Sequence, residues 1–251
     1  IWTVNVHPAY SCYTDTRTLN FALMDTLLGG SGADQFDFAD NAALAGSLDG
    51  NAGNDSLNYA AYTSVRNFTL TALGSTDGFD GTVNGIAAGF ADINNIRGGS
   101  ALDTLTGLNA DSHWSLNAAN SGVYTSTNAL TFSAVDTFSG NAAADHFDFA
   151  DGATLAGLLD GGGGIDSLDY GDYISAVAID LSTGQATGIN LSNPNSVSNV
   201  ENISGGWAND LLTGDAAANV ITGNAGHDQL AGLGGDDTYI FTDSWGNDTL
   251  A

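Results

Sequence analysis

The sequence predicts an all-β chain wound as an elongated parallel β-solenoid, and three observations support this prediction. Four glycine-rich nonapeptides run end to end from Gly205, Gly214, Gly223 and Gly232. A strict nine-residue period makes each unit one turn plus one short strand of a solenoid. The acids are nearly all Asp, which favours turns, and Glu201 is the only Glu. No stretch shows the capped i, i+3, i+4, i+7 apolar pattern of a helix.

Short segments with alternating apolar residues supply the expected strands. They cover residues 35–38, 56–59, 67–70 and 178–181, and each is bounded by Gly or Asp. Inside a coil the apolar side chains would stack in ladders. The expected core includes Phe36, Phe38, Phe147 and Phe149.

The nonapeptide also occurs upstream as isolated copies, so the chain holds nine copies. The further copies begin at Gly29, Gly50, Gly98, Gly140 and Gly161. Numbered from place one to place nine, every unit has Asp or Asn at place six. Glycines let the backbone bend and aim its carbonyl oxygens inward, and the Asp adds a carboxylate. Calcium takes six to eight such oxygens, so the turns are candidate calcium sites.

These units resemble the repeats-in-toxin (RTX) nonapeptide of secreted bacterial proteins, Gly-Gly-x-Gly-x-Asp-x-apolar-x. The units from Gly29 and Gly161 match every fixed position. The resemblance implies a parallel β-roll (a form of β-helix) in which several calcium ions lie between stacked turns. Each turn would give carbonyl oxygens and one Asp.

The resemblance also implies the individual ligands. The expected side-chain ligands are Asp34, Asp55, Asp103, Asp145, Asp166, Asp210, Asp228 and Asp237, with Asn219 as a weaker amide ligand. The expected backbone ligands are at Gly29, Ser31, Gly205, Trp207, Gly223 and Ala225. In the terminal array, coils two units apart would stack, so Asp210 and Asp228 share one edge and Asn219 and Asp237 the other. Alanine replaces the fourth glycine at Ala101, Ala143, Ala208 and Ala217, which would strain a turn that needs positive φ there.

A longer repeat organises the chain. Residues 32–62 align with 143–173 at an offset of 111, and residues 96–107 align with 203–214 after a deletion of four. The sequence therefore predicts one module over 1–112, a second over 113–214, and a nonapeptide array over 215–251 that continues the second module. Because solenoid coils contact only their neighbours, such modules can be duplicated freely. The alternative architecture is an antiparallel β-sandwich in each module.

Charge limits the possible functions. The chain has 29 Asp and Glu against 3 Lys and Arg, a net charge of −26 over 251 residues, yet 43% of its residues are hydrophobic. Such charge opposes compaction and disfavours nucleic-acid binding. Bound cations would neutralise the acidic rows, so we expect folding with calcium and loosening without it. A halophile-like acidic surface is the alternative.

Several other residues have two readings. Trp2 and Trp114 open their modules and could cover a coil edge or stack on carbohydrate, whereas Trp207 and Trp245 are expected to be exposed contact points. Other acids outside place six form turns or contact metal: Asp40, Asp49, Asp151 and Asp160. The stretch 76–81 lacks the distal Glu of an EF-hand and is expected to be a loop.

Catalysis finds little support in the sequence. There is no His-Glu-x-x-His pair, no Gly-x-Ser-x-Gly elbow and no lysine. The lone Cys12 cannot form an internal disulfide, and no apolar run approaches the roughly 18 residues of a membrane span. The chain is expected to be non-enzymatic, with a sugar-active solenoid as the alternative, since Asp pairs of the glycosidase type could occur anywhere in so Asp-rich a chain.

Two functions remain open. The first is a calcium-stabilised structural rod segment of a secreted bacterial adhesin, surface layer or extracellular filament, with head-to-tail self-association through residues 1–20 and 240–251. Carbohydrate or cell-surface contact is a further expectation. The alternative is the C-terminal RTX secretion and folding region of a type I-secreted hydrolase or toxin. Either implies a secreted, extracellular or cell-surface location.

Overall fold

The protein is built from β-strands. A computed structural model describes residues 2–4, 10–14, 17–21, 26–190, 192–241 and 246–251, and no α-helix occurs among them. The chain divides into two compact units. Unit 1 comprises residues 1–108 and 123–135, and unit 2 comprises residues 109–122 and 136–251. The module boundaries at 112 and 214 stay predictions.

Unit 1 contains two sheets. Its strands are β1 (Trp2–Val4), β2 (Tyr10–Thr14), β3 (Arg17–Phe21), β4 (Thr26–Leu28), β5 (Gln35–Phe38), β6 (Ser47–Asp49), β7 (Ser56–Asn58), β8 (Asn67–Leu73), β9 (Phe79–Val83), β10 (Ile86–Ile93), β11 (Asn95–Arg97), β12 (Thr104–Thr106) and β15 (Ala129–Ser133). One sheet runs β15-β11-β7-β5-β1-β2-β3 and the other β12-β8-β9-β10-β6-β4. Pairing is parallel except at β1-β2-β3 and β8-β9-β10.

Parallel in-register pairing stacks the core of unit 1 in columns. Phe36 pairs with Leu57, Leu57 with Ile96, and Ile96 with Phe132, and all four side chains are buried. Because strand side chains alternate between faces, each buried residue leaves its neighbours outside. The alternation of β5 in the sequence therefore becomes one rung of this column.

Unit 2 contains three sheets. Its strands are β13 (Ser112–Ala118), β16 (Thr137–Ser139), β17 (Asp145–Phe149), β18 (Leu159–Asp160), β19 (Ser167–Asp169), β20 (Ala178–Asp180), β21 (Gln185–Ala186), β22 (Val197–Ser198), β23 (Asn202–Ser204), β24 (Leu211–Thr213), β25 (Val220–Thr222), β26 (Gln229–Ala231), β27 (Thr238–Ile240) and β28 (Thr249–Leu250). The sheets run β27-β25-β23-β19-β17-β13, β22-β18-β16 and β28-β26-β24-β20-β21, and only β20-β21 is antiparallel. β14 (Ser121–Thr125) lies where the sequence passes between the units.

The core of unit 2 is a second column. Trp114 pairs with Phe147, and the column continues through Leu168, Ile203 and Ile221. Trp114 is completely buried, and its ring stacks on Phe147 at a centroid distance of 5.5 Å. Trp114 is therefore a core residue, not a carbohydrate platform. The side chain of Trp2 and the whole of Trp245 lie outside the described residues.

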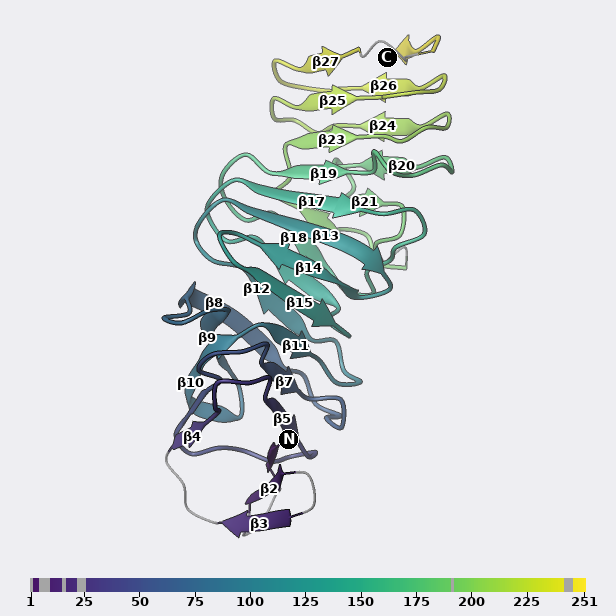
Figure 1. Ribbon diagram of the computed structural model, residues 1–251. Helices are drawn as coiled ribbons and strands as arrows, with labels where there is room; N and C mark the ends of the chain where they lie inside the picture. Colours follow the sequence, from purple (N-terminus) through teal and green to yellow (C-terminus); the bar gives the residue numbers. More distant parts are fainter. Residues whose placement is uncertain (1, 5–9, 15–16, 22–25, 191, 242–245) are drawn as a thin grey trace. The chain divides into compact units, whose positions relative to one another are not determined.

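The parallel sheets make the fold all-β and solenoid-like, as predicted, and not an antiparallel sandwich. In the terminal array, β23, β25 and β27 stack along one side, with β24, β26 and β28 along the other (Figure 1). Two nonapeptides thus make one coil, as their spacing predicts. Within the described part of the chain, no helix has the length and apolar character needed to cross a bilayer.

Candidate metal centre

The nine nonapeptides form nine turns of one design. In each, places one to six make the turn, and places seven to nine form or begin a strand. The strands that follow the turns are β5, β7, β12, β17, β19, β24, β25, β26 and β27. The side chain at place six lies where the turn passes into the strand. All the predicted side-chain ligands therefore occupy equivalent positions.

A ladder of hydrogen bonds connects the sixth places of successive coils. The backbone N–H of Asp34 donates to Asp55 Oδ1 at 2.7 Å, and that of Asp145 donates to Asp166 Oδ1 at 2.8 Å. In the terminal array, Asp210 N–H donates to Asp228 Oδ1 at 2.8 Å, and Asn219 N–H donates to Asp237 Oδ1 at 3.0 Å. These bonds pair Asp210 with Asp228 and Asn219 with Asp237, the arrangement that the two-unit spacing predicts.

In four turns, the second carboxylate oxygen of the place-six Asp takes no part in this ladder. Oδ2 is buried without a hydrogen-bond partner in Asp55, Asp145, Asp166 and Asp228. Each of these residues is at most 2% exposed. A buried charged oxygen without a partner costs several kcal/mol unless something compensates it. These four oxygens are the strongest indication that the turns hold a cation.

A glycine at place one lets this oxygen approach the backbone closely. A Cβ on Gly50 would lie 2.7 Å from Asp55 Oδ2, and one on Gly161 would lie 2.6 Å from Asp166 Oδ2. The same hypothetical atom would also meet a backbone carbonyl oxygen of the following coil, as Gly29 meets that of Gly50. Place one therefore borders a cradle formed by one carboxylate oxygen and one carbonyl oxygen from the next coil.

The backbone at place two divides the turns into two kinds. In the closed turns, which begin at Gly29, Gly98, Gly205 and Gly214, the place-two N–H donates to the place-six side chain. In the open turns, which begin at Gly50, Gly140, Gly161, Gly223 and Gly232, place two has positive φ. There the amide turns away, and in two open turns it donates to an Asp before the turn, from Asn51 to Asp49 and from Gly162 to Asp160. All four carboxylate oxygens without partners belong to open turns.

The expected strain at place four does not arise. None of Ala101, Ala143, Ala208 and Ala217 has positive φ. At place four, positive φ occurs only at glycines, at Gly53, Gly164, Gly226 and Gly235. A Cβ on Gly164 would lie 2.5 Å from the carbonyl oxygen of Ala143 in the preceding turn. Positive φ at place four therefore accompanies packing on the preceding turn, whereas Gly32, which has no atom within 4 Å of its Cβ position, does not adopt it.

The electrostatics of the open turns reflect this burial. Burial raises the pKa of Asp145 to about 7, against the hydrogen bond from Ser112. Burial raises the pKa of Asp166 to about 6, with added repulsion from the Glu201 and Asp160 carboxylates. Burial likewise raises the pKa of Asp228 to about 6, and that of Asp55 is also raised. The turns that hold Asp55, Asp145, Asp166 and Asp228 thus each contain a carboxylate whose charge the protein alone does not stabilise.

A hard cation fits this donor set. No three His, Cys, Asp or Glu side chains among the described residues converge on one point, so an ion here must take most of its oxygens from the backbone. Calcium accepts mixed carboxylate and carbonyl oxygen ligands in flexible geometry. When bound, it would supply the positive charge that the buried carboxylates lack.

The predicted backbone ligands differ in their surroundings. The carbonyl oxygens of Gly29 and Gly205 accept hydrogen bonds from Asn51 Nδ2 at 3.0 Å and Asn224 Nδ2 at 2.8 Å. Each carbonyl oxygen has a second lone pair for a metal. The Gly223 carbonyl oxygen lies at the cradle of Gly205. Ser31 is exposed, Ala225 donates its N–H to the Gly206 carbonyl, and Trp207 is 66% exposed. Their roles as ligands stay predictions.

Two residues that the nonapeptide pattern does not predict continue the ladder. Asp55 N–H donates to Asn94 Oδ1, and Asp166 N–H donates to Glu201 Oε2, both at 2.8 Å. Neither acceptor belongs to a nonapeptide. The longer internal repeat could have predicted them, because residues 94 and 201 are 107 positions apart, as are the aligned residues 96 and 203.

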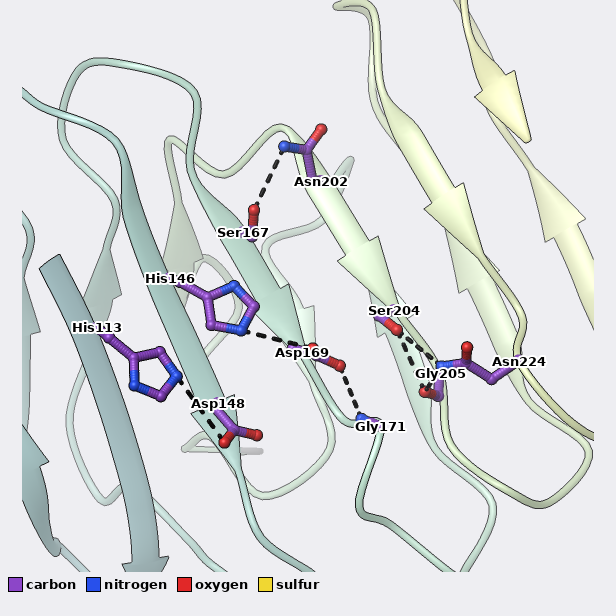
Figure 2. Close-up of polar contacts among 10 residues, drawn as sticks. All are labelled: His113, His146, Asp148, Ser167, Asp169, Gly171, Asn202, Ser204, Gly205 and Asn224. Carbon is purple, nitrogen blue, oxygen red and sulfur yellow. Dashed lines mark hydrogen bonds and ion pairs between the residues drawn. The ribbon is translucent and has the colours of Figure 1, made fainter. Parts of the chain in front are cut away.

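A second polar group lies outside the turns, on the outward face of β13, β17 and β19 (Figure 2). His113 and His146 stack at a centroid distance of 5.0 Å. His146 Nε2 lies 3.5 Å from Asp169 Oδ2, and His113 Nε2 lies 4.0 Å from Asp148 Oδ2. The hydrogen bond to Asp169 raises the pKa of His146, whereas burial and the charge of His146 lower that of His113. As the pH falls, His146 is therefore protonated before His113.

Fold and site together define a solenoid-like, all-β protein with calcium-type glycine turns. A profile of the RTX calcium-binding nonapeptide repeat matches the chain in four copies, over residues 25–40, 47–61 and 204–239. The chain therefore contains RTX repeats in these segments, and RTX repeats bind calcium. The turns from Gly98, Gly140 and Gly161 lie outside the matched ranges but have the same design. No curated protein matches the chain significantly.

Proposed function

We propose that this chain is a calcium-stabilised structural segment of a secreted bacterial protein, of the adhesin, surface-layer or filament type. The observation that carries the proposal is the set of four buried carboxylate oxygens without partners, each beside a glycine cradle. Several calcium ions would neutralise a chain of net charge −26 and fix its coils. External calcium concentrations favour folding after export, which agrees with an extracellular location.

A structural role is supported by how the coils are filled. The interiors of both units are occupied by buried apolar columns, so the coils enclose packed side chains. The side chains predicted as calcium ligands lie in turns, and the histidine pair lies on an outward face. The chain is accordingly proposed to be non-enzymatic.

Calcium titration of the metal-free chain tests this function. We expect far-ultraviolet circular dichroism to report a cooperative gain of β-structure on adding calcium, reversed by EDTA. Magnesium demands a rigid octahedral shell and should not replace calcium. A spectrum that is the same in EDTA and in calcium would contradict the proposal.

Self-association head to tail is the proposed mode of assembly. β27 and β28 are the last strands of their sheets, and Ile240 and Leu250 on them are 44% and 53% exposed. Sheet edges of this kind pair readily with another chain. Sedimentation in calcium should show concentration-dependent association; a monomer at all concentrations would contradict it.

Contact with carbohydrate or a cell surface is a further element of the proposal. Trp207 borders a hollow that is also lined by Asp169, Ser204 and Asn224. An exposed indole beside hydrogen-bonding groups suits a saccharide. Trp207→Ala should abolish retention on a glycan array without changing the circular dichroism; unchanged retention would contradict this element.

The second candidate function is the secretion and folding region of a type I-secreted hydrolase or toxin. The four contiguous nonapeptides from Gly205 favour it. The full-length gene product distinguishes the two: a hydrolase or toxin domain in the same polypeptide supports this candidate, and further solenoid modules support the structural role.

A further inference from the structure

In each unit, a pair of turns 21 residues apart is followed by a segment that is not a nonapeptide. After the turn from Gly50, the next coil presents Asp92, Ile93 and Asn94. After the turn from Gly161, it presents Asn199, Val200 and Glu201. These two three-residue segments, here called stand-in segments, lie outside every range that the repeat profile matches.

The two stand-in segments have the same geometry. Each begins with a residue of positive φ, 53° at Asp92 and 51° at Asn199. Each places a buried apolar residue second. In each, two successive amides donate to the carbonyl oxygen of the sixth-place Asp: Asn94 and Asn95 to Asp55, and Glu201 and Asn202 to Asp166. Two segments of different sequence therefore dock on the preceding turn identically.

The stand-in segments reproduce both oxygens that a nonapeptide would supply. The carbonyl oxygens of Asp92 and Asn199 lie at the cradles of Gly50 and Gly161, where other turns receive a carbonyl from the next nonapeptide. The side-chain oxygens of Asn94 and Glu201 accept the sixth-place amide, where other turns use an Asp. Each cradle is thus complete without a second nonapeptide.

The carboxylate at each cradle is buried and unpaired. Asp55 is completely buried and Asp166 is 1% exposed, and Oδ2 of each has no hydrogen-bond partner in the described structure. The charged groups that act on them are all acids, namely Asp34, Asp77 and Asp92 around Asp55, and Glu201 and Asp160 around Asp166. Negative charge gathers at both cradles with nothing positive to offset it.

In unit 1 the additional acid comes from the loop at residues 76–81. Asp92, 2% exposed, holds this loop by accepting the N–H groups of Thr76 and Asp77 on Oδ1, at 2.8 and 3.3 Å. Asp77 then accepts the place-four N–H of Gly53 at 3.0 Å and Asn94 Nδ2 at 3.2 Å. The loop, which resembles a calcium loop only loosely in sequence, thereby brings a carboxylate onto the open turn.

In unit 2 the additional acid is Glu201 itself. Its longer side chain reaches the Asp166 amide from a segment that has no glycine turn. The acidic residue stands at opposite ends of the two stand-in segments. Unit 1 has Asp92 first and Asn94 last, whereas unit 2 has Asn199 first and Glu201 last. Each of the two open turns therefore has an additional carboxylate bonded to its backbone, Asp77 at Gly53 in unit 1 and Glu201 at Asp166 in unit 2.

We propose that each unit holds a calcium site of mixed origin, formed by an open turn on one side and a stand-in segment on the other. In unit 1 the site uses Asp55, the Asp92 carbonyl and Asp77. In unit 2 it uses Asp166, the Asn199 carbonyl and Glu201. These two sites add to those between nonapeptides, and the inference rests on the calcium-binding function proposed above.

Counting bound calcium in variants of the full chain tests this inference. Glu201→Gln keeps an oxygen for the Asp166 amide but removes the charge, so the fold in calcium should be retained. At about 1 mM free calcium, the range of extracellular modules, equilibrium dialysis should find one ion fewer than in the unchanged chain. Asp77→Asn should independently remove one ion, and the double variant two.

Asp172→Asn is the matched control, because Asp172 is exposed and lies outside the turns. It makes the same change of charge and should bind as many ions as the unchanged chain. An unchanged ion count in both Glu201→Gln and Asp77→Asn would overturn the inference, as would an equal loss in the control. Absence of calcium binding by the unchanged chain would instead overturn the proposed function itself.

Discussion

Units 1 and 2 share their turns but differ in what lies between them. Both contain a turn pair 21 residues apart, from Gly29 to Gly50 and from Gly140 to Gly161, followed by a stand-in segment. Unit 1 then inserts the antiparallel strands β8, β9 and β10, with Phe68, Phe79 and Phe90 buried. Unit 2 has only the short strands β20, β21 and β22 in the corresponding region, and adds the terminal array.

Arg66 of unit 1 and the aligned Val177 of unit 2 have different side chains but make the same backbone contact with a turn. Arg66 is 8% exposed, with its guanidinium 4.3 Å from the Tyr62 ring centroid, whereas unit 2 has the buried Val177 at the equivalent place. Yet both backbone amides donate to a sixth-place carboxylate, Arg66 to Asp103 and Val177 to Asp210. The backbone bonds to the turns are kept while the side chains change. We infer that turns determine the coil, and that apolar packing determines how much stability a unit has without metal.

Calcium removal should have the largest effect, and the loss of protection should differ between the two units. With EDTA, amides of residues 204–240 should lose hydrogen-exchange protection, because their short strands depend on the turns. Amides of β8 to β10 should keep more, because a buried aromatic core supports them. Hydrogen-exchange mass spectrometry with and without EDTA measures this, and equal loss in both regions would contradict the comparison.

Filling one cradle should have the next largest effect. Gly161→Ala places a Cβ 2.6 Å from Asp166 Oδ2 and should reduce the free energy of unfolding in calcium by about 1–3 kcal/mol. Gly163→Ala is the control in the same turn, where the nearest atom would be 3.8 Å away. Urea unfolding of both variants gives the difference, and equal stabilities would mean that place one tolerates a side chain.

Acidification should stabilise the metal-free chain, mainly in unit 2. The pKa values of Asp145, Asp166 and Asp228 in the folded chain, about 7, 6 and 6, exceed the ordinary value of 3.8. The folded state therefore binds more protons between pH 4 and 7, so its stability falls as pH rises through this window. From pH 7.5 to 5 we expect the melting midpoint of the metal-free chain to rise as these carboxylates become protonated. Thermal melts in EDTA would show the opposite trend if these carboxylates were solvated.

The smallest effect should come from relieving one open turn of unit 2. Leu233 is 62% exposed and has φ of 69°, which costs a side-chain-bearing residue about 1–2 kcal/mol. Leu233→Gly should therefore stabilise the chain by about 0.5–1 kcal/mol in calcium after the entropy cost of glycine. Leu102→Gly, at a site 57% exposed without positive φ, should destabilise it by a similar amount. Urea midpoints that move the same way in both variants would contradict this.

The sequence predicted the fold well where a periodic pattern met a packed column. The alternation at residues 35–38 gave β5, and the two-unit period gave the stacking of the array. The insertion of β8, β9 and β10 was not predicted as a sheet, because its pairing depends on contacts between strands and not on local spacing. Trp114 became a core residue because its register opposite Phe147 leaves it no access to solvent.

At the candidate site, place six was predicted and its environment was not. The division into open and closed turns follows φ at place two, and both kinds accept Gly there, so the pattern alone does not separate them. Asn51, Asn141 and Asn224 are the visible signal, since Asn tolerates positive φ better than most residues. The stand-in segments escaped notice because only their backbone, not their residue types, resembles a turn.

The ladder of amides also has a direction. In every rung described above, the N–H of one coil is received by a carboxylate or amide oxygen later in the chain. Backbone amides bond in the opposite sense, since Ser56 N–H donates to the Asp34 carbonyl and Asn94 N–H donates to the Asp55 carbonyl. Adjacent coils are therefore joined in both directions, by side-chain acceptors on the later coil and carbonyl acceptors on the earlier one. Deleting a coil from either side would strip the acceptor from an amide of its neighbour.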